Sequence, residues 1–240
     1  MRNYTDPGYR PFQGQGQFDS TPLANVATAP GQLLSKVLGL ITFAFLFTVA
    51  GVLIGSRLGP GGFLPAIIGM FASLLILMAV RNKTPANLIL LYAFATFEGL
   101  LLGPLLDSFV QQGMGSIVLD AAAGTAAVTF LAGSYGYTTR RNVSGLGGIL
   151  FVALIGIIVS SVVGMFLQLT LLSLLISVAA VAIFSGYIIY DFNRLAKTKL
   201  ATEGDAIMFA VALYLDMINI FLSLLNILSF LNGGGGSRRS

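Results

Sequence analysis

Residues 169–193 read LTLLSLLISVAAVAIFSGYIIYDFN, a stretch that is almost wholly apolar until it reaches Asp191. An α-helix rises about 1.5 Å per residue, so about 20 residues of this kind cross the roughly 30 Å of hydrocarbon in a bilayer. The stretch therefore predicts a transmembrane helix that carries an acidic side chain near its end.

The rest of the chain repeats this pattern. Of its 240 residues, 56% are hydrophobic and 9% are charged, whereas about a quarter of the residues in a soluble domain are charged. The sequence therefore predicts an all-α membrane protein, in which the GxxxG spacings at Gly51/Gly55 and Gly99/Gly103 favour close helix approach. Seven transmembrane helices are expected near residues 33–56, 61–80, 86–110, 114–138, 146–167, 169–193 and 205–231.

Two tails flank this domain of residues 32–231. Residues 1–31 are rich in Gly, Pro and Gln, which predicts a disordered tail, and residues 232–240 contain a run of Gly that predicts a flexible one. Seven crossings place most Lys and Arg residues on the side of the N-terminus, so the positive-inside rule predicts a cytoplasmic N-terminus and an outer C-terminus. No organellar presequence is recognisable, so we expect a bacterial plasma membrane.

The inventory of side chains excludes several classes of chemistry. The chain has no Cys and no His, so disulfides, thiolate metal sites and catalysis by Ser/His/Asp or Cys/His sets are excluded. Its net charge of +4 lies mainly in short loops, where it indicates membrane orientation and not nucleic-acid binding. We expect neither enzymatic activity nor a bound cofactor, and any pH sensing near neutrality must come from carboxylates.

Four ionisable residues lie inside the expected helices or at their ends, where each costs a few kcal/mol or more and is a functional candidate. Asp191 precedes a basic cluster, and Asp216 lies about one turn inside the last helix, so the two carboxylates are expected to share one level. Arg81 ends the second helix on the same side. Glu98 lies near the middle of the third helix and is either a structural hydrogen-bonding group or part of an ion path.

A polar stripe runs along the last helix at about 100° per residue. Lipid does not accommodate such a stripe, so it predicts a lumen or a polar interface. The alternative is that these residues form interhelical hydrogen bonds that lock a helix bundle. The stripe consists of Asp205, Asp216, Asn219, Ser223 and Asn226, and the preceding helix carries a thinner one formed by Ser173, Ser177 and Asp191.

The motifs GYIIYDFNRL (186–195) and ALYLDMINIFLSLLNIL (212–228), with YAFATFEG (92–99) as a weaker match, resemble the Bax inhibitor-1 family, including its bacterial YccA-like members. The resemblance covers about residues 36–231. It implies six helices packed around a central seventh and a pH-dependent leak of Ca²⁺. It also implies that Asp191 and Asp216 form a proton-sharing pair that acts as pH sensor and gate, with Arg81 matching the arginine that ends the family's second helix.

The resemblance leads to a hypothesis for the mechanism. Two carboxylates held close together in a low-dielectric site cannot both ionise cheaply, so Asp191 and Asp216 are expected to share a proton, while Arg81 favours the ionised form. Titration would then move the second or the seventh helix. We expect the two aspartates to coordinate Ca²⁺ transiently, with membrane lipid, protons and a membrane protein as further partners. Further candidates for the ion path are Glu98, Asn219, Ser223 and Asn226.

Three other functions stay open. An intramembrane aspartyl protease also uses two aspartates, one of them in a YD dipeptide, but its GxGD motif is missing around Asp216 and Asp205. A proton-coupled secondary transporter suits a titrating carboxylate pair, although no inverted repeat is recognisable. A non-transporting regulator of stress survival or membrane quality control would use the same charges to stabilise a binding scaffold.

Overall fold

The computed structural model describes residues 30–167, 170–198 and 201–233. Seven long helices make up most of this part of the chain, and each coincides with one of the predicted segments, which confirms the all-α class. The predicted tails lie outside the described residues, except for residues 30–31 and 232–233, which belong to the first and last helices. The helices are α1 (Pro30–Gly55), α2 (Phe63–Val80), α3 (Ala86–Gln111), α4 (Gly115–Thr138), α5 (Leu146–Leu167), α6 (Thr170–Lys197) and α7 (Glu203–Gly233), with a short 3-10 helix η2 (Pro60–Gly62) before α2.

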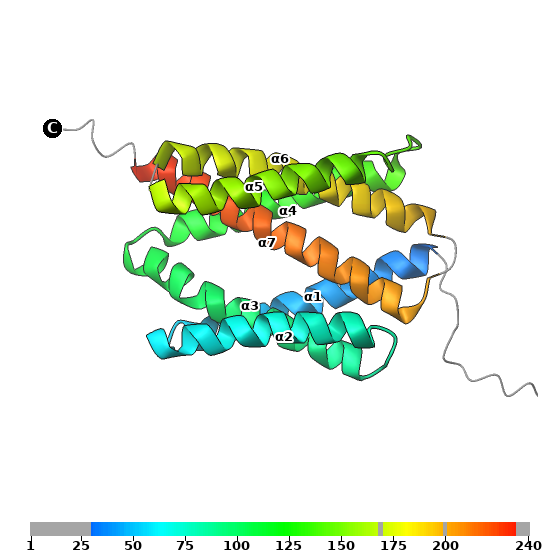
Figure 1. The fold of residues 1–240 in the computed structure, drawn as a ribbon, viewed down its shortest axis with the longest axis horizontal. Coiled ribbons are helices and arrows are strands. Elements are labelled where there is room, and N and C mark those ends of the chain that lie inside the picture. Colours follow the sequence, from blue (N-terminus) through cyan, green and yellow to red (C-terminus); the bar gives the residue numbers. More distant parts are fainter. Residues whose placement is uncertain (1–29, 168–169, 199–200, 234–240) are drawn as a thin grey trace, which may run out of the picture.

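Helix α7 lies between two groups of helices (Figure 1). On one side α1 and α2 pack against α3, and on the other side α4 and α5 pack against α6. Helix α7 packs against α6, α4, α1 and α3. Its residues Leu213, Tyr214 and Ile220 are completely buried by this packing. The main neighbours of α2 and α5 are α3 and α6, so the finer expectation that six helices surround α7 stays a prediction.

Glycines let α1 and α3 approach each other closely. A Cβ atom built on Gly51 of α1 would lie 3.0 Å from the Cα of Gly99 in α3, and one built on Gly103 would lie 2.7 Å from the carbonyl carbon of Gly55. The second distance is too short for a real Cβ atom, and the first is shorter than most real Cβ contacts. The close approach expected from the GxxxG spacings is therefore confirmed for this pair of helices.

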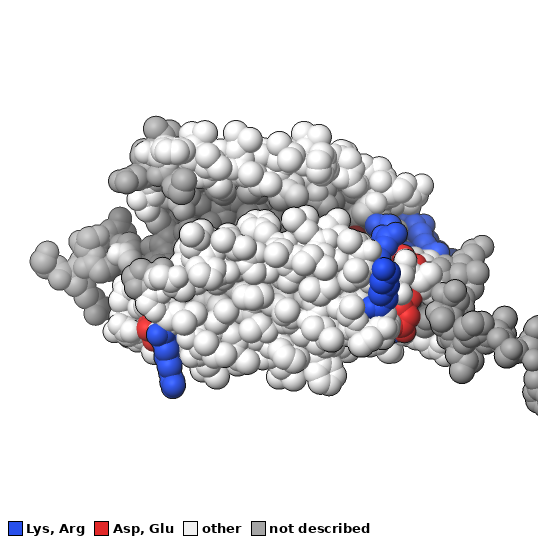
Figure 2. All heavy atoms as spheres, turned by 60° about the horizontal axis from the view of Figure 1, so that its bottom comes forward, with Lys and Arg blue, Asp and Glu red and all other residues white. Residues whose placement is uncertain are grey.

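Large apolar side chains cover the outside of the bundle between its two ends. Phe130, Val152 and Phe166 are 72%, 71% and 77% exposed, and Figure 2 shows a broad face without charged residues between two charged ends. An apolar surface of this extent is stable in lipid and not in water. Because all seven helices are long and apolar enough to cross a bilayer, the chain is a multi-pass membrane protein.

Basic residues gather at one end of the bundle, which we call the basic end. It carries the α2–α3, α4–α5 and α6–α7 connections and the first turns of α1 (Figure 1). Among the described residues, Arg57 is the single Lys or Arg at the opposite end. This distribution agrees with the positive-inside argument, while the orientation in the membrane stays a prediction. The basic residues described at the basic end are Lys36, Arg81, Lys83, Arg140, Arg141, Arg194 and Lys197.

Candidate functional site

A cavity of about 1010 Å³ lies between α5, α6 and α7. Asp191 and Asp216 both line it, as do the side chains of the polar stripe beyond Asp205. The stripes predicted on α6 and α7 therefore face a common space. The other polar residues in its wall are Ser161, Ser173, Ser177, Tyr187, Tyr190, Asn219, Ser223 and Asn226.

Asp216 is held inside the bundle by α7. The preceding turn of the helix places Tyr214 and Leu213 in the apolar core, which fixes the rotation of α7 about its axis. The Asp216 side chain is 6% exposed, and its Oδ2 atom has no hydrogen-bond partner among the described residues. A buried polar atom without a partner costs about 1–3 kcal/mol. A buried acid that carries this cost is a candidate for a functional role.

Asp191 lies in the part of α6 that approaches the basic end, and it is 7% exposed. It is close enough to Asp216 for their charges to interact. Arg194, one turn further along α6, is close enough to Asp191 to act on it electrostatically. The structure thus brings the two predicted aspartates together and places the guanidinium of Arg194 within electrostatic reach of Asp191.

The uncharged polar residues of the stripe bond mainly within α7. Asn219 Nδ2 donates to the carbonyl oxygen of Leu215 over 2.8 Å, and Ser223 Oγ donates to the carbonyl oxygen of Asn219 over 2.7 Å. Asn226 Nδ2 instead donates to Ser173 Oγ on α6 over 2.9 Å. The interhelical alternative therefore applies to Asn226, whereas the hydrogen bonds of Asn219 and Ser223 stay within α7, and both residues line the cavity.

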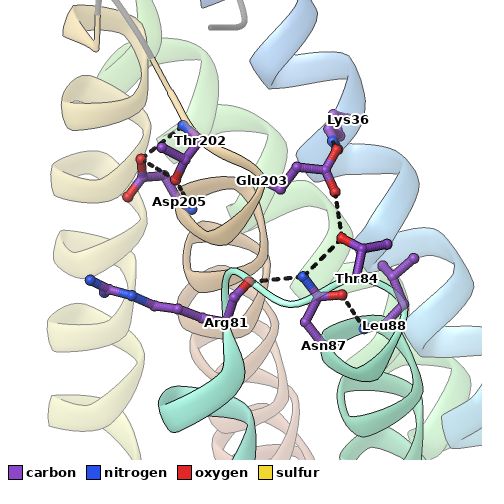
Figure 3. A network of polar contacts seen from close by, with 8 residues as sticks. All are labelled: Lys36, Arg81, Thr84, Asn87, Leu88, Thr202, Glu203 and Asp205. Atoms are coloured by element: carbon purple, nitrogen blue, oxygen red, sulfur yellow. Dashed lines mark hydrogen bonds and ion pairs between the residues drawn. The ribbon is translucent and has the colours of Figure 1, made fainter. Parts of the chain in front are cut away.

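Arg81 lies next to the first turn of α7 and not among the residues that line the cavity. Figure 3 shows its side chain below Asp205, and the two charges are close enough to interact. Arg194 acts on the same carboxylate. The predicted grouping of Arg81 with Asp191 and Asp216 at the gate stays a prediction.

Asp205 was placed on the polar stripe from the sequence, and the structure gives it another role. Its Oδ2 accepts hydrogen bonds from the backbone N–H and the hydroxyl of Thr202, over 2.9 and 2.8 Å, and its own N–H donates to Thr202 Oγ1 over 3.2 Å. This reciprocal arrangement is a capping box, which satisfies donors at the start of α7 (Figure 3). Asp205 therefore anchors the helix and does not line the cavity.

A polar network that the sequence did not reveal joins α1, the α2–α3 connection, α3 and α7 at the basic end (Figure 3). Glu203 in the first turn of α7 forms an ion pair with Lys36 of α1 and accepts a 3.1 Å hydrogen bond from Thr84 in the α2–α3 connection. In the first turn of α3, Asn87 Nδ2 donates a 2.8 Å hydrogen bond to the carbonyl oxygen of Arg81. The residues are far apart in the chain, so no spacing in the sequence could have identified the network.

Glu98 lies away from the cavity. It is close enough to Tyr214 of α7 to act on it electrostatically, and the Tyr214 hydroxyl shares a 2.8 Å hydrogen bond with Thr48 of α1. The structure therefore does not bring Glu98 together with Asn219, Ser223 and Asn226, and its place in an ion path stays a prediction.

The oxygen atoms that α6 and α7 contribute to the lining can contact a cation but cannot enclose one. The described residues contain no group of three or more acidic side chains that could hold a metal ion. Two carboxylates with neutral hydroxyl and amide oxygens can replace part of the hydration shell of a hard cation such as Ca²⁺. They do not form a complete cage, so the arrangement favours brief contact and release.

Comparisons with known proteins match nearly all of the described chain. The model of a family described as inhibitor of apoptosis-promoting Bax1 matches residues 31–233. A protein of Escherichia coli K12 called modulator of FtsH protease YccA is 34% identical over 190 residues, which are 79% of this chain and 85% of that protein. An uncharacterised protein of Campylobacter jejuni is 37% identical over 153 residues, which are 63% of this chain and 65% of that protein.

Proposed function

This chain belongs to the Bax inhibitor-1 family of membrane proteins, and we propose that it is a pH-sensitive calcium leak whose ion path is the cavity between α5, α6 and α7. The observation that carries the proposal is the Asp216 side chain, which lines that cavity beside a second buried aspartate and whose Oδ2 atom has no hydrogen-bond partner among the described residues. Two buried acids between transmembrane helices are costly, which makes them candidates for transport or sensing.

The two aspartates act as the gate in this proposal. When Asp191 and Asp216 share one proton, only one negative charge lies in the site. Loss of that proton leaves two buried negative charges that repel each other. The repulsion changes the packing of α6 against α7 at the basic end. Arg194 is the cation best placed to moderate this step, because it already acts on Asp191, and Arg81 acts through the start of α7.

Calcium flux into liposomes that contain the purified protein tests the gate. We expect Asp191→Asn and Asp216→Asn each to flatten the dependence of flux on pH, because an amide does not titrate in this range. Asp120→Asn is the matched control, since Asp120 is an exposed acid on α4 outside the cavity, and it should leave the profile unchanged. If both gate variants keep the flux and the pH profile of the original protein, the aspartates are not the gate.

The name of the Escherichia coli relative supports a second candidate, the regulation of a membrane-bound protease. In this alternative the buried acids stabilise a scaffold, and the exposed apolar faces of the helices contact the partner. The two functions separate in one experiment. Stoichiometric co-purification with a membrane protease, and altered turnover of its membrane substrates, should persist in Asp216→Asn if regulation is independent of ion flux. If the turnover of the protease's substrates instead changes in parallel with calcium flux across the variants, the leak is the primary function.

A further inference from the structure

The cavity between α5, α6 and α7 is larger than the passage of an ion requires. Its volume of about 1010 Å³ lies at the upper end of the roughly 300–1,000 Å³ found for sites that bind organic molecules. A binding site of that size has room for a ligand with several carbon atoms. Size alone does not identify the ligand, so its class must come from the lining.

The lining is divided into walls of different character. The wall from α7 carries Asp216, Asn219 and Ser223 in succession, and α6 adds Asp191, whereas the wall from α5 is mainly apolar. The lining contains acidic residues but neither Lys nor Arg. The apolar residues of the α5 wall are Leu154, Ile157, Ile158 and Val162.

This division argues against two classes of occupant. A lipid acyl chain would leave the carboxyl, amide and hydroxyl groups of α6 and α7 in contact with hydrocarbon, which is unfavourable. An anion would meet two carboxyl groups and no positively charged residue in the lining. A molecule with a cationic head and a short apolar body matches both walls.

We propose that this cavity is a binding site for primary alkylammonium ions, with the ammonium group at Asp216 and the alkyl chain against α5. An ammonium group has three N–H donors, and the carboxyl-bearing side chain of Asp216 lines the cavity while its Oδ2 atom has no hydrogen-bond partner among the described residues. Asp191 is close enough to share the positive charge. A charge-assisted hydrogen bond to the carboxyl group of Asp216 would therefore hold the ammonium group at the α7 wall.

The proposal names a ligand class for the cavity and does not rest on calcium passage. Binding of hexylammonium to the full chain in lipid nanodiscs, measured by isothermal titration calorimetry without Ca²⁺, tests it directly. Empty nanodiscs give the contribution of partitioning into lipid. We expect saturable binding of hexylammonium and at least tenfold weaker binding of hexanol and of hexanoate, which have a similar chain without the positive charge.

Variants locate the site within the cavity. Asp216→Asn should weaken hexylammonium binding at least tenfold, and Asp120→Asn should leave it unchanged. Ser161→Leu narrows the apolar side of the cavity, so it should weaken hexylammonium binding while leaving methylammonium binding unaffected, which separates loss of space from loss of fold. The proposal is overturned if hexanol binds as tightly as hexylammonium, or if Asp216→Asn binds hexylammonium like the original chain. Calcium flux in the same preparations reports separately on the leak.

Discussion

The orphaned oxygen of Asp216 is a cost in stability that the fold retains. The side chain is buried, and its Oδ2 atom lacks a partner among the described residues. Replacing a buried unsatisfied polar group by an apolar one of similar size removes that cost. Residues that serve binding or gating frequently reduce stability in this way.

We therefore expect Asp216→Leu to raise the free energy of unfolding by about 1–3 kcal/mol while it abolishes the pH dependence of calcium flux. Thermal unfolding of the detergent-solubilised protein, followed by circular dichroism, measures the first effect. Asp120→Leu is the control, and as a change at an exposed position it should shift stability by about 0.5 kcal/mol or less. A lower melting temperature for Asp216→Leu than for the original chain would show that the carboxyl group stabilises the fold.

Single residues were predicted less well than the helices that carry them. Periodicity places Asp205 on the same face of α7 as Asp216, but it does not reveal that α7 begins at Glu203 and that Asp205 is used to cap it. Glu98 was recognised as a costly charge, yet its neighbours across the bundle depend on packing between distant segments. A helical pattern gives the angular position of a side chain about the helix axis. Tertiary packing decides which residues that side chain contacts.

At the scale of elements, the contact of α1 with α3 depends on glycine. A Cβ at Gly51 would meet the backbone of Thr96 and Gly99, and backbone atoms cannot move aside as a flexible side chain can. Gly156 in the middle of α5 is the matched control, because a Cβ there would meet nothing within 4 Å. The two positions separate a packing effect from a general effect of glycine in helices.

We expect Gly51→Ala to lower the free energy of unfolding by about 1–3 kcal/mol through overpacking. Gly156→Ala should instead leave it unchanged or raise it by about 0.5–1 kcal/mol, because alanine is the better helix former. Unfolding by SDS in mixed micelles measures both. Equal effects at the two positions would mean that the close approach of α1 and α3 contributes no stability.

The start of α7 offers a second test at this scale. Thr202 and Asp205 cap the helix through three hydrogen bonds, so Thr202→Ala should cost about 0.5–2 kcal/mol of stability, whereas Thr202→Ser keeps the hydroxyl and should cost less. The same SDS titration compares the two variants. If serine proves as harmful as alanine, the methyl group and not the cap is what stabilises this turn.

At the scale of the whole molecule, the bundle separates an apolar belt from two polar ends. The seven predicted segments could be located because a helix must be apolar over a fixed length to cross a bilayer. The order in which the helices pack could not, since α1 pairs with α3 and α4 with α6 through contacts between segments that are distant in sequence. The network of Lys36, Thr84 and Glu203 is a further product of that packing.

The asymmetry of the two ends predicts how the molecule sits in the membrane. Seven of the eight described Lys and Arg residues lie at the basic end, and basic loops are retained in the cytoplasm during insertion. The chain has no Cys, so single cysteines can report on each side. Ser144, in the α4–α5 connection, lies at the basic end, and Gln112, after α3, lies at the opposite one; both are exposed.

We expect a membrane-impermeant maleimide added to intact bacterial cells to label Gln112→Cys and not Ser144→Cys. Both variants should react after the inner membrane is permeabilised, which controls for the accessibility of each cysteine. The reagent must first pass the outer membrane where the host has one, so a periplasmic marker protein with one cysteine serves as the positive control. The reverse pattern would place the basic end outside, and it would then move Asp191 and Asp216 to the outer mouth of the cavity, where external pH and not cytoplasmic pH would set their charge.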